Sequence, residues 1–177
     1  LAKRDKNFTI ARIYNSKREG FTIINYAING ASTSEGDTCF VCADEYNESI
    51  ILNKNISLLG IEGAEKTIIN GNNETVLHAS SGKLIKGFTF ISTLNMGIFI
   101  MFGTDLQFTY NRTLLNKIEF HLSKNIDITN NTFINLKSLE LTTDGSRINN
   151  NQATATTPYI LLFGSDNEIF GNTNFYL

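Results

Sequence analysis

Three residues in the second half of the chain, Glu119, His121 and Glu140, have the types and spacing for acid–base or metal chemistry. On a strand, alternate residues share a face, so all three would point outward if the apolar residues between them point inward. Carboxylates on neighbouring strands, roughly 5 Å apart, could bind Ca²⁺ or act as an acid/base pair in polysaccharide cleavage. The alternative, which we favour, is an inert, solvated face on which His121 moderates the charge, because paired surface carboxylates are common.

A second row of polar residues stands just before another set of apolar positions: Gln107, Asp127, Arg147 and Glu168. If these residues stack in register, they predict a ladder of surface ion pairs from Asp127 through Arg147 to Glu168. A lyase that uses an arginine as base beside a metal ion needs several acidic ligands around it. Only one Asp, Asp127, lies next to Arg147 in this row, so we interpret the row as surface ion pairs.

The elements that position these residues follow a repeat of 20 to 21 residues. One apolar series lies at this spacing and a second follows it by two residues: Ile98, Ile118, Leu139 and Ile160, then Ile100, Phe120, Leu141 and Leu162. Apolar pairs at i and i+2 are typical of strands, and a fixed period of this length predicts a solenoid. We therefore predict an all-β, single-stranded parallel β-helix of about seven coils with three short strands per coil, right-handed by the crossover rule.

Asparagine is unusually frequent, with 23 residues, and one series repeats with the coils: Asn111, Asn131, Asn151 and Asn172. Asn tolerates left-handed backbone and forms hydrogen bonds in tight turns. We predict that these four side chains form a structural ladder along the solenoid axis.

Four apolar residues fall at outward positions of the third strand of a coil: Phe99, Met101, Leu161 and Phe163. Strict alternation along the same strand places Phe102 inward, like Ile98 and Ile100. Outward apolar residues on a solenoid need a cover or a partner. They predict either a binding surface or protomer contact, or a site covered by a loop or by the N-terminal segment.

The domain boundaries follow from where the repeat begins. Residues 1–36 do not match it and contain a plausible short helix around residues 25–31, so we expect an N-terminal cap. Residues 37–177 form the predicted β-helix. Because Leu177 falls in the middle of a coil, we expect the solenoid to continue beyond it or to dock onto another chain.

Charge and composition exclude several classes of partner. The net charge of −2 gives no electrostatic case for nucleic acid or an anionic membrane. The longest apolar run, around residues 96–102, is far shorter than the roughly 20 residues of a transmembrane helix.

The pattern Cys39-x-x-Cys42 lies in a predicted strand, where residues i and i+3 point to opposite faces. We predict two unlinked thiols, with Cys39 inward and Cys42 near the surface.

Sequons for N-glycosylation offer modification sites if the protein is secreted in a glycosylating organism. The candidates are Asn7, Asn47, Asn55, Asn73 and Asn130. A sixth sequon starts at Asn111, which belongs to the ladder and is the weakest candidate because we expect it to face inward.

Residues 27–71 carry a resemblance to a known superfamily. The segments are Ala27-Ile28-Asn29, Glu35-Gly36-Asp37-Thr38, Asp44-Glu45-Tyr46-Asn47-Glu48, Ile56-Ser57-Leu58-Leu59-Gly60 and Thr67-Ile68-Ile69-Asn70-Gly71. Their order resembles the opening coils of pectin-lyase-like right-handed parallel β-helix proteins, and is especially similar to adhesin-like surface proteins of methanogenic archaea. Later Ile-x-x-Asn-Asn-x-Phe segments extend the resemblance to about residues 25–177. Cys42 departs from it, since relatives often have Pro there.

The resemblance implies the fold but not the activity, because the superfamily contains lyases, hydrolases and non-catalytic adhesins. We expect a non-catalytic adhesin-like or envelope module at the cell surface or outside the cell that binds glycans or proteins. The alternative is a polysaccharide lyase or glycoside hydrolase that acts on an acidic polysaccharide near Glu119, His121 and Glu140. We expect no cofactor, with Ca²⁺ as the one candidate ion, and self-association through coil ends or the outward apolar residues.

Overall fold

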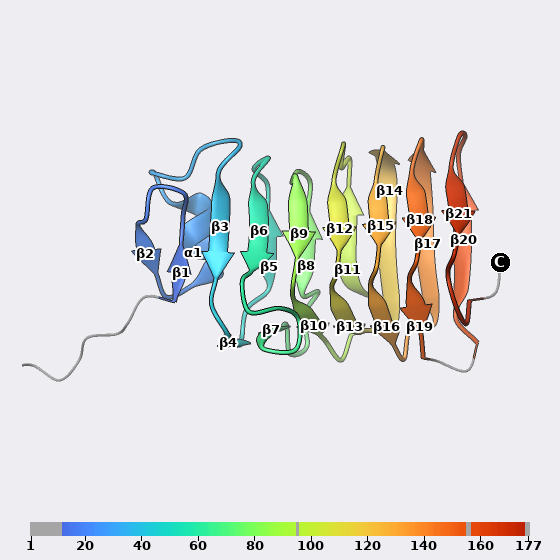
Figure 1. Ribbon diagram of the computed structural model, residues 1–177, viewed down its shortest axis with the longest axis horizontal. Coiled ribbons are helices and arrows are strands. Elements are labelled where there is room, and N and C mark those ends of the chain that lie inside the picture. Colours follow the sequence, from blue (N-terminus) through green and yellow to red (C-terminus); the bar gives the residue numbers. More distant parts are fainter. Residues whose placement is uncertain (1–11, 95, 155–156, 176–177) are drawn as a thin grey trace, which may run out of the picture.

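The computed structural model describes residues 12–94, 96–154 and 157–175 of the chain. The chain winds through three sheets, called A, B and C, whose strands stack along one long axis (Figure 1). Sheets B and C each contain six strands, which gives six complete coils, and sheet A continues by one further strand. The predicted all-β solenoid with three strands per coil and one short N-terminal helix is confirmed, with six complete coils where about seven were expected.

Each sheet collects one strand from every coil, and sheet A also includes two antiparallel strands of the N-terminal cap. Sheet A contains β1 (Ile13–Tyr14), β2 (Gly20–Phe21), β3 (Thr38–Val41), β6 (Ser57–Gly60), β9 (Leu84–Lys86), β12 (Gln107–Thr109), β15 (Asp127–Thr129), β18 (Arg147–Asn149) and β21 (Glu168–Phe170). Sheet B contains β4 (Asp44–Tyr46), β7 (Thr67–Asn70), β10 (Thr89–Ile91), β13 (Arg112–Leu114), β16 (Thr132–Ile134) and β19 (Gln152–Ala153). Sheet C contains β5 (Ile50–Leu52), β8 (Leu77–Ala79), β11 (Met96–Met101), β14 (Lys117–Lys124), β17 (Ser138–Asp144) and β20 (Tyr159–Phe163).

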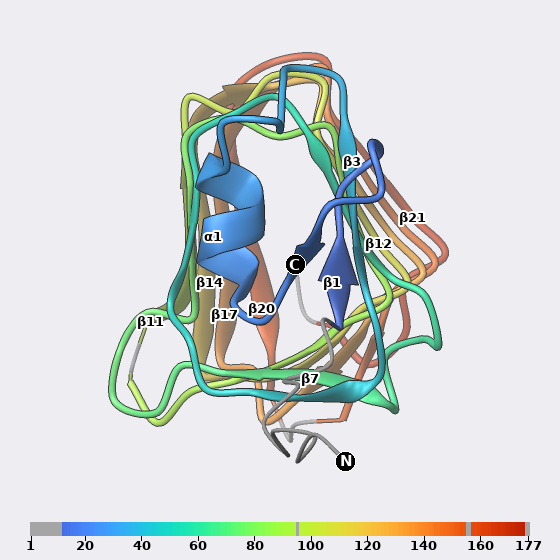
Figure 2. The same ribbon diagram turned by 90° about the vertical axis from the view of Figure 1, so that its left-hand side faces the viewer.

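The winding of the solenoid is right-handed. Seen from the N-terminal end in Figure 2, the chain passes from sheet A (β3, β12) through sheet B (β7) to sheet C (β14, β17) in a clockwise direction. Successive coils lie farther from the viewer, in the order that Figure 1 shows from left to right. A clockwise path that recedes is a right-handed screw, as the crossover rule for parallel strands requires.

The core is the column enclosed by the three sheets. Ile98, Ile118, Leu139 and Ile160 are register partners on successive strands of sheet C and all four are buried. The rings of Phe90 and Phe108 stack at 5.9 Å in the column. Because each core residue packs on its counterpart about one repeat away, stability comes mainly from contacts between neighbouring coils.

The asparagine series forms a buried hydrogen-bonded column at the corner between sheets A and B. The Oδ1 atoms of the last three members accept the backbone N–H of the ladder residue in the preceding coil at 2.9 Å: Asn131 from Asn111, Asn151 from Asn131, and Asn172 from Asn151. The Oδ1 of Asn111 accepts the Phe88 N–H at 3.1 Å. Each Nδ2 donates to a backbone carbonyl of an earlier coil, as Asn131 does to Phe108 at 2.8 Å. The amides thus satisfy backbone groups that no neighbouring strand reaches at the turn.

The residue before each ladder position has left-handed backbone, which lets the chain turn sharply into sheet B. The φ angles are 52° at Tyr110, 56° at Asn130 and 53° at Asn150. Asn is among the few residues that adopt this conformation readily. Asparagine is therefore frequent for two reasons: it forms the ladder at one turn position, and it adopts the left-handed backbone at the position before it.

The N-terminal end of the column is covered by residues 12–37. The helix α1 (Ile24–Asn29) lies across the mouth of the first coil (Figure 2), with Ile24, Ala27 and Ile28 buried. Beside it, β1 pairs antiparallel with β3 and with β2, so the edge of sheet A is occupied. The cap thereby shields both the apolar column and a strand edge from water.

Two side chains lock α1 to the first coil. The Glu48 carboxylate accepts the backbone N–H groups of Ile24 at 2.8 Å and Asn25 at 3.1 Å, which caps the helix N-terminus from outside the helix. Asn25 donates to the Ser49 carbonyl at 2.8 Å and accepts from the Ile51 N–H at 2.9 Å. Its amide thereby pairs with the free edge of β5 as a neighbouring strand would.

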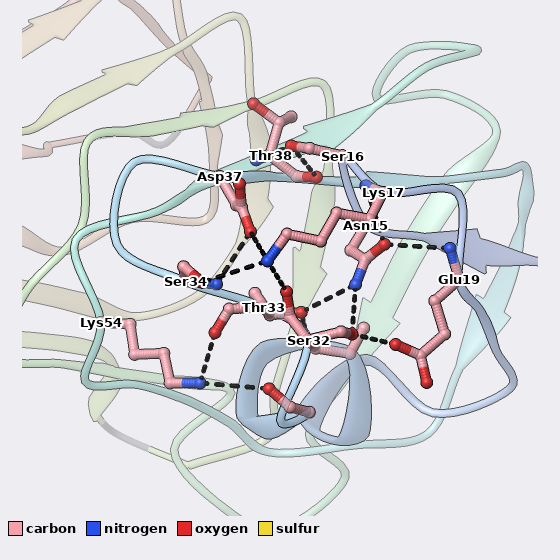
Figure 3. A network of polar contacts seen from close by, with 12 residues as sticks. Asn15, Ser16, Lys17, Glu19, Ser32, Thr33, Ser34, Asp37, Thr38 and Lys54 are labelled. Carbon is pink, nitrogen blue, oxygen red and sulfur yellow. Dashed lines mark hydrogen bonds and ion pairs between the residues drawn. The ribbon is translucent and has the colours of Figure 1, made fainter.

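A network of polar contacts joins the loop after β1 to the loop after α1 (Figure 3). The Lys17 ammonium lies 3.8 Å from the Asp37 carboxylate and 3.2 Å from the Ser34 hydroxyl. Lys54, from the first coil, donates to the Thr33 carbonyl at 3.0 Å. These contacts fix the cap to the turn that leads into β3.

Phe102 departs from the alternation that the sequence predicts. Its side chain is 60 % exposed, whereas Ile98 and Ile100 on the same strand are buried. Phe102 has a φ of 60°, so the chain leaves β11 through a left-handed residue, and the alternation of faces ends there. The inward assignment of Phe102 is therefore wrong.

Candidate functional site

The outward side of sheet C brings the candidate catalytic residues together, and we call it the sheet C face. Glu119 of β14 is the register partner of Glu140 of β17, as their spacing predicts. Glu119 also pairs with Phe99 of β11, and Glu140 pairs with Leu161 of β20. One outward row therefore runs from an apolar residue through two carboxylates to a second apolar residue.

A lysine that the sequence interpretation missed occupies the centre of this face. The Lys117 ammonium contacts the Glu119 carboxylate and lies 2.8 Å from Glu140 Oε2. Ser138, the register partner of Lys117, donates to Glu140 Oε1 at 3.0 Å. Lys117 stands two residues before Glu119, so the alternation of faces could have revealed it.

Glu119 is far less accessible than its outward position suggests. Only 5 % of the residue is exposed, because Lys117 and His121 flank it on its own strand. The expectation of a solvated face is therefore wrong for Glu119. A buried carboxylate needs a partner of opposite charge, and Lys117 supplies it.

His121 extends the cluster toward the aromatic part of the face. Its Nε2 lies 3.0 Å from Glu119 Oε2. Its ring lies 5.5 Å from the Phe99 ring, which in turn lies 5.5 Å from the His78 ring on β8. The sequence interpretation missed His78, although it precedes Phe99 by the same repeat that relates Glu119 to Glu140.

The pKa values of this cluster shift in directions that stabilise its charged form. Burial alone would raise the pKa of Glu140, but hydrogen bonds from Lys117 and Ser138 outweigh it and lower the pKa below 4.5. Hydrogen bonds to Glu119 and Glu140 raise the pKa of Lys117 above 10.5. The Glu140 contribution to stability is present above its unfolded pKa and is lost as the pH falls through the lowered value. The Lys117 contribution is present below its unfolded pKa and is lost as the pH rises through the raised value.

This geometry is poorly suited to an acid/base pair. A general acid needs a raised pKa and access to the glycosidic oxygen, whereas the pKa of Glu140 is lowered. The Lys117 ammonium also contacts both carboxylates, so it stands where a scissile bond would have to lie. Among residues 12–94, 96–154 and 157–175, no group of three or more His, Cys, Asp or Glu gathers at metal-binding distance.

The four outward apolar residues lie on the sheet C face in two separate groups. Phe99 and Met101 are half-buried near the N-terminal coils. Leu161 is 39 % exposed and Phe163 is 60 % exposed on β20. The Lys117 cluster separates the groups, so they form two apolar areas around a charged centre rather than one patch.

The sheet A face carries the second predicted row. Asp127, Arg147 and Glu168 are register partners on β15, β18 and β21. Arg147 binds Asp127 through two parallel hydrogen bonds, from Nε at 2.9 Å and from Nη2 at 3.0 Å. No ion pair joins Arg147 to Glu168 within the described part of the chain, so the predicted ladder forms between two of its three members.

The cysteines and the sequons differ in accessibility. Cys39 and Cys42 are unlinked, as predicted, with Cys39 buried and Cys42 half-buried. Burial, reinforced by Asp37, raises the pKa of Cys39 to about 11, so its thiol is largely protonated at neutral pH. The sequon residues with exposed side chains are Asn47, Asn55, Asn73 and Asn130, whereas Asn111 is 2 % exposed and Asn7 lies outside the described residues.

Comparisons with known proteins assign no family to this chain. No family model matches the sequence, and neither a curated protein nor a solved structure matches it. The structure establishes a parallel β-solenoid, and the resemblance to the pectin-lyase-like superfamily stays an expectation. The helix that the structure describes is too short to cross a membrane.

Proposed function

We propose that this chain is a non-catalytic binding module of an adhesin-like or envelope protein at the cell surface. Its partner, a surface glycan or another protein, contacts the sheet C face. The observation that carries the proposal is the exposure of large apolar side chains on this rigid sheet, where Ile51 is 55 % and Phe163 is 60 % exposed. Grouped apolar side chains that face solvent mark interaction surfaces.

The N-terminal half of the face offers a shallow apolar hollow. It measures about 270 Å³ and is lined mainly by Ile51, His78, Phe99 and Met101. The edge contact between the His78 and Phe99 rings orients both side chains. A hollow of this kind suits a ring or an aliphatic group of a partner.

The charged centre of the face supports a binding role more than a catalytic one. Lys117 is engaged by Glu119 and Glu140, and His121 is engaged by Glu119. The face therefore presents apolar areas beside a fixed polar cluster, which is the composition of many protein interfaces. The four exposed sequon asparagines are compatible with a location outside the cell.

The proposal is tested with Ile51→Ser and Phe163→Ser, each compared with Ile61→Ser. Ile61 is 50 % exposed and follows β6 in sheet A, so it controls for the loss of an exposed apolar side chain. Each protein is screened on a glycan array with and without Ca²⁺, and polyuronate hits are assayed for unsaturated products. We expect at least one array ligand to bind without turnover such that both face variants reduce its binding and Ile61→Ser retains it. Product release that Glu140→Gln abolishes would refute the non-catalytic proposal.

A further inference from the structure

A groove of about 830 Å³ lies at the corner where the chain passes from sheet C to sheet A, and we call it the corner groove. Its volume falls within the roughly 300–1,000 Å³ of typical ligand pockets. Its walls come from three successive coils, and the side chains that matter here are Asn55, Ser81, Lys83, Phe102, Asp105 and Gln107. The groove adjoins the apolar hollow on the sheet C face, with which it shares Ser80, but Ile51 and Phe99 line only the hollow.

Phe102 gives the corner groove an apolar platform. Its positive φ of 60° turns the side chain out of the core and leaves the ring 60 % exposed. This backbone is unfavourable for a bulky residue, and such outliers gather at ligand sites. The turn of the next coil repeats the geometry with Leu122, which has a φ of 49° and is 60 % exposed but does not line the groove.

The rest of the groove supplies hydrogen-bonding groups that are not already engaged. In the described part of the chain, the side chains of Asn55, Lys83 and Gln107 make no hydrogen bond or ion pair. Asp105 accepts from Asn125 Nδ2 at 2.9 Å through Oδ1, which fixes the carboxylate and leaves Oδ2 available. The groove therefore offers both hydrogen-bond donors and hydrogen-bond acceptors next to one aromatic ring.

We propose that the corner groove binds the pyranose rings of an electrically neutral glycan. A pyranose has an apolar C–H face and a rim of hydroxyl groups that donate and accept hydrogen bonds. The Phe102 ring covers the apolar face, while Asp105, Gln107 and Lys83 bind the hydroxyl rim. This proposal rests on the proposed function only in placing the glycan at the cell surface.

The charge of the groove selects a neutral sugar over an acidic one. One cation, Lys83, faces one carboxylate, Asp105, so the lining has no net charge. The carboxylate of a uronate would be attracted by Lys83 and repelled by Asp105. The adjoining hollow of about 330 Å³ shares Asp105 and Gln107 and adds the paired charges of Asp127 and Arg147, so the two cavities taken together also carry no net charge.

The axial layout matches a chain of sugars rather than a single one. Neighbouring strands of the sheet are about 4.8 Å apart, which is close to the advance of one pyranose along an extended glycan. Asn55, Lys83 and Asp105 come from three successive coils, and the adjoining hollow continues along the axis to Arg147. Successive sugars can therefore meet side chains from successive coils.

The test measures binding of neutral tetrasaccharides of β-1,4-linked glucose, mannose and N-acetylglucosamine by isothermal titration, with tetragalacturonate as the acidic counterpart. The variants are Phe102→Ala and Gln107→Ala, and Leu122→Ala is the matched control from the equivalent turn. We expect at least one neutral tetrasaccharide to bind more tightly than tetragalacturonate. Each groove variant should weaken that binding at least about tenfold, while Leu122→Ala leaves it unchanged.

Three results would overturn the proposal: no binding of any neutral tetrasaccharide, tighter binding of tetragalacturonate, or equal binding by Phe102→Ala and the wild type. Phe102→Gly adds a control for folding, because glycine accepts the positive φ without strain, and it should lose binding as Phe102→Ala does. Ile51→Ser separates the two sites. Retained tetrasaccharide binding by this variant supports the corner groove, and its loss places the sugar on the sheet C face instead.

Discussion

Replacing Asn131 with leucine tests how much the buried asparagine column stabilises the solenoid. Asn131 is 1 % exposed, accepts from the Asn111 N–H at 2.9 Å and donates to the Phe108 carbonyl at 2.8 Å. Leucine is similar in size and can make neither bond. A buried N–H and a buried carbonyl therefore lose these partners while the packing volume is largely kept.

The expected loss follows from these two groups. An orphaned buried donor costs about 1–3 kcal/mol, and a lost hydrogen bond about 0.5–1.5 kcal/mol. We therefore expect Asn131→Leu to lower the free energy of unfolding by about 2–4 kcal/mol. For a chain of this size that corresponds to a fall in Tm of roughly 4–16 °C.

The assay is guanidinium unfolding at pH 7, followed by far-ultraviolet circular dichroism, with Tm as a second measure. Asn130→Gly is the matched control, because Asn130 is the exposed neighbour with a φ of 56°, which glycine adopts freely. Its stability should stay within about 0.5 kcal/mol of the wild type. Equal stability of Asn131→Leu and Asn130→Gly would refute the reasoning.

Two further perturbations probe the Lys117 cluster and the cysteines. Lys117→Met should destabilise the fold by about 1–3 kcal/mol at pH 7, because it leaves Glu119 buried without its cation. The deficit in the urea midpoint should shrink as the pH falls through the lowered pKa of Glu140, where the wild type also loses the stabilisation from the Lys117–Glu140 pair, and an equal deficit at neutral and acidic pH would contradict this. At pH 8 a thiol reagent should modify Cys42 faster than Cys39, whose pKa is about 11. Equal labelling rates by mass spectrometry would disagree with the buried position of Cys39.

The periodic part of the fold is readable from the sequence because each coil repeats the same local requirements. The spacing of Ile118 and Leu139 fixes the inward face, and the same spacing places Glu119 beside Glu140. Register follows from the burial of one face, since a shift by one residue would expose the whole row. Pairing between coils was therefore predictable without any knowledge of side-chain contacts.

The departures occur where one residue leaves the regular strand geometry or where a contact depends on side-chain reach. Phe102 points outward because of a single positive φ, which alternation cannot reveal. In β13 the residue in register with Phe90 and Phe133 is the buried, polar Thr113, so the inward row is not apolar at every coil. Lys117 lies on the predicted face, but only the structure shows that its ammonium reaches both carboxylates.

The parallel pairing between coils has a mechanical consequence. The backbone hydrogen bonds of each sheet join neighbouring coils and run along the solenoid axis, so a force that draws the two ends apart can open the coil boundaries one at a time. From β11 onward, register partners in successive coils are 20 to 21 residues apart, and an extended chain spans about 3.3–3.6 Å per residue. Each of these coils that detaches would therefore release roughly 65–75 Å of chain. A module of this shape would lengthen in discrete steps under load.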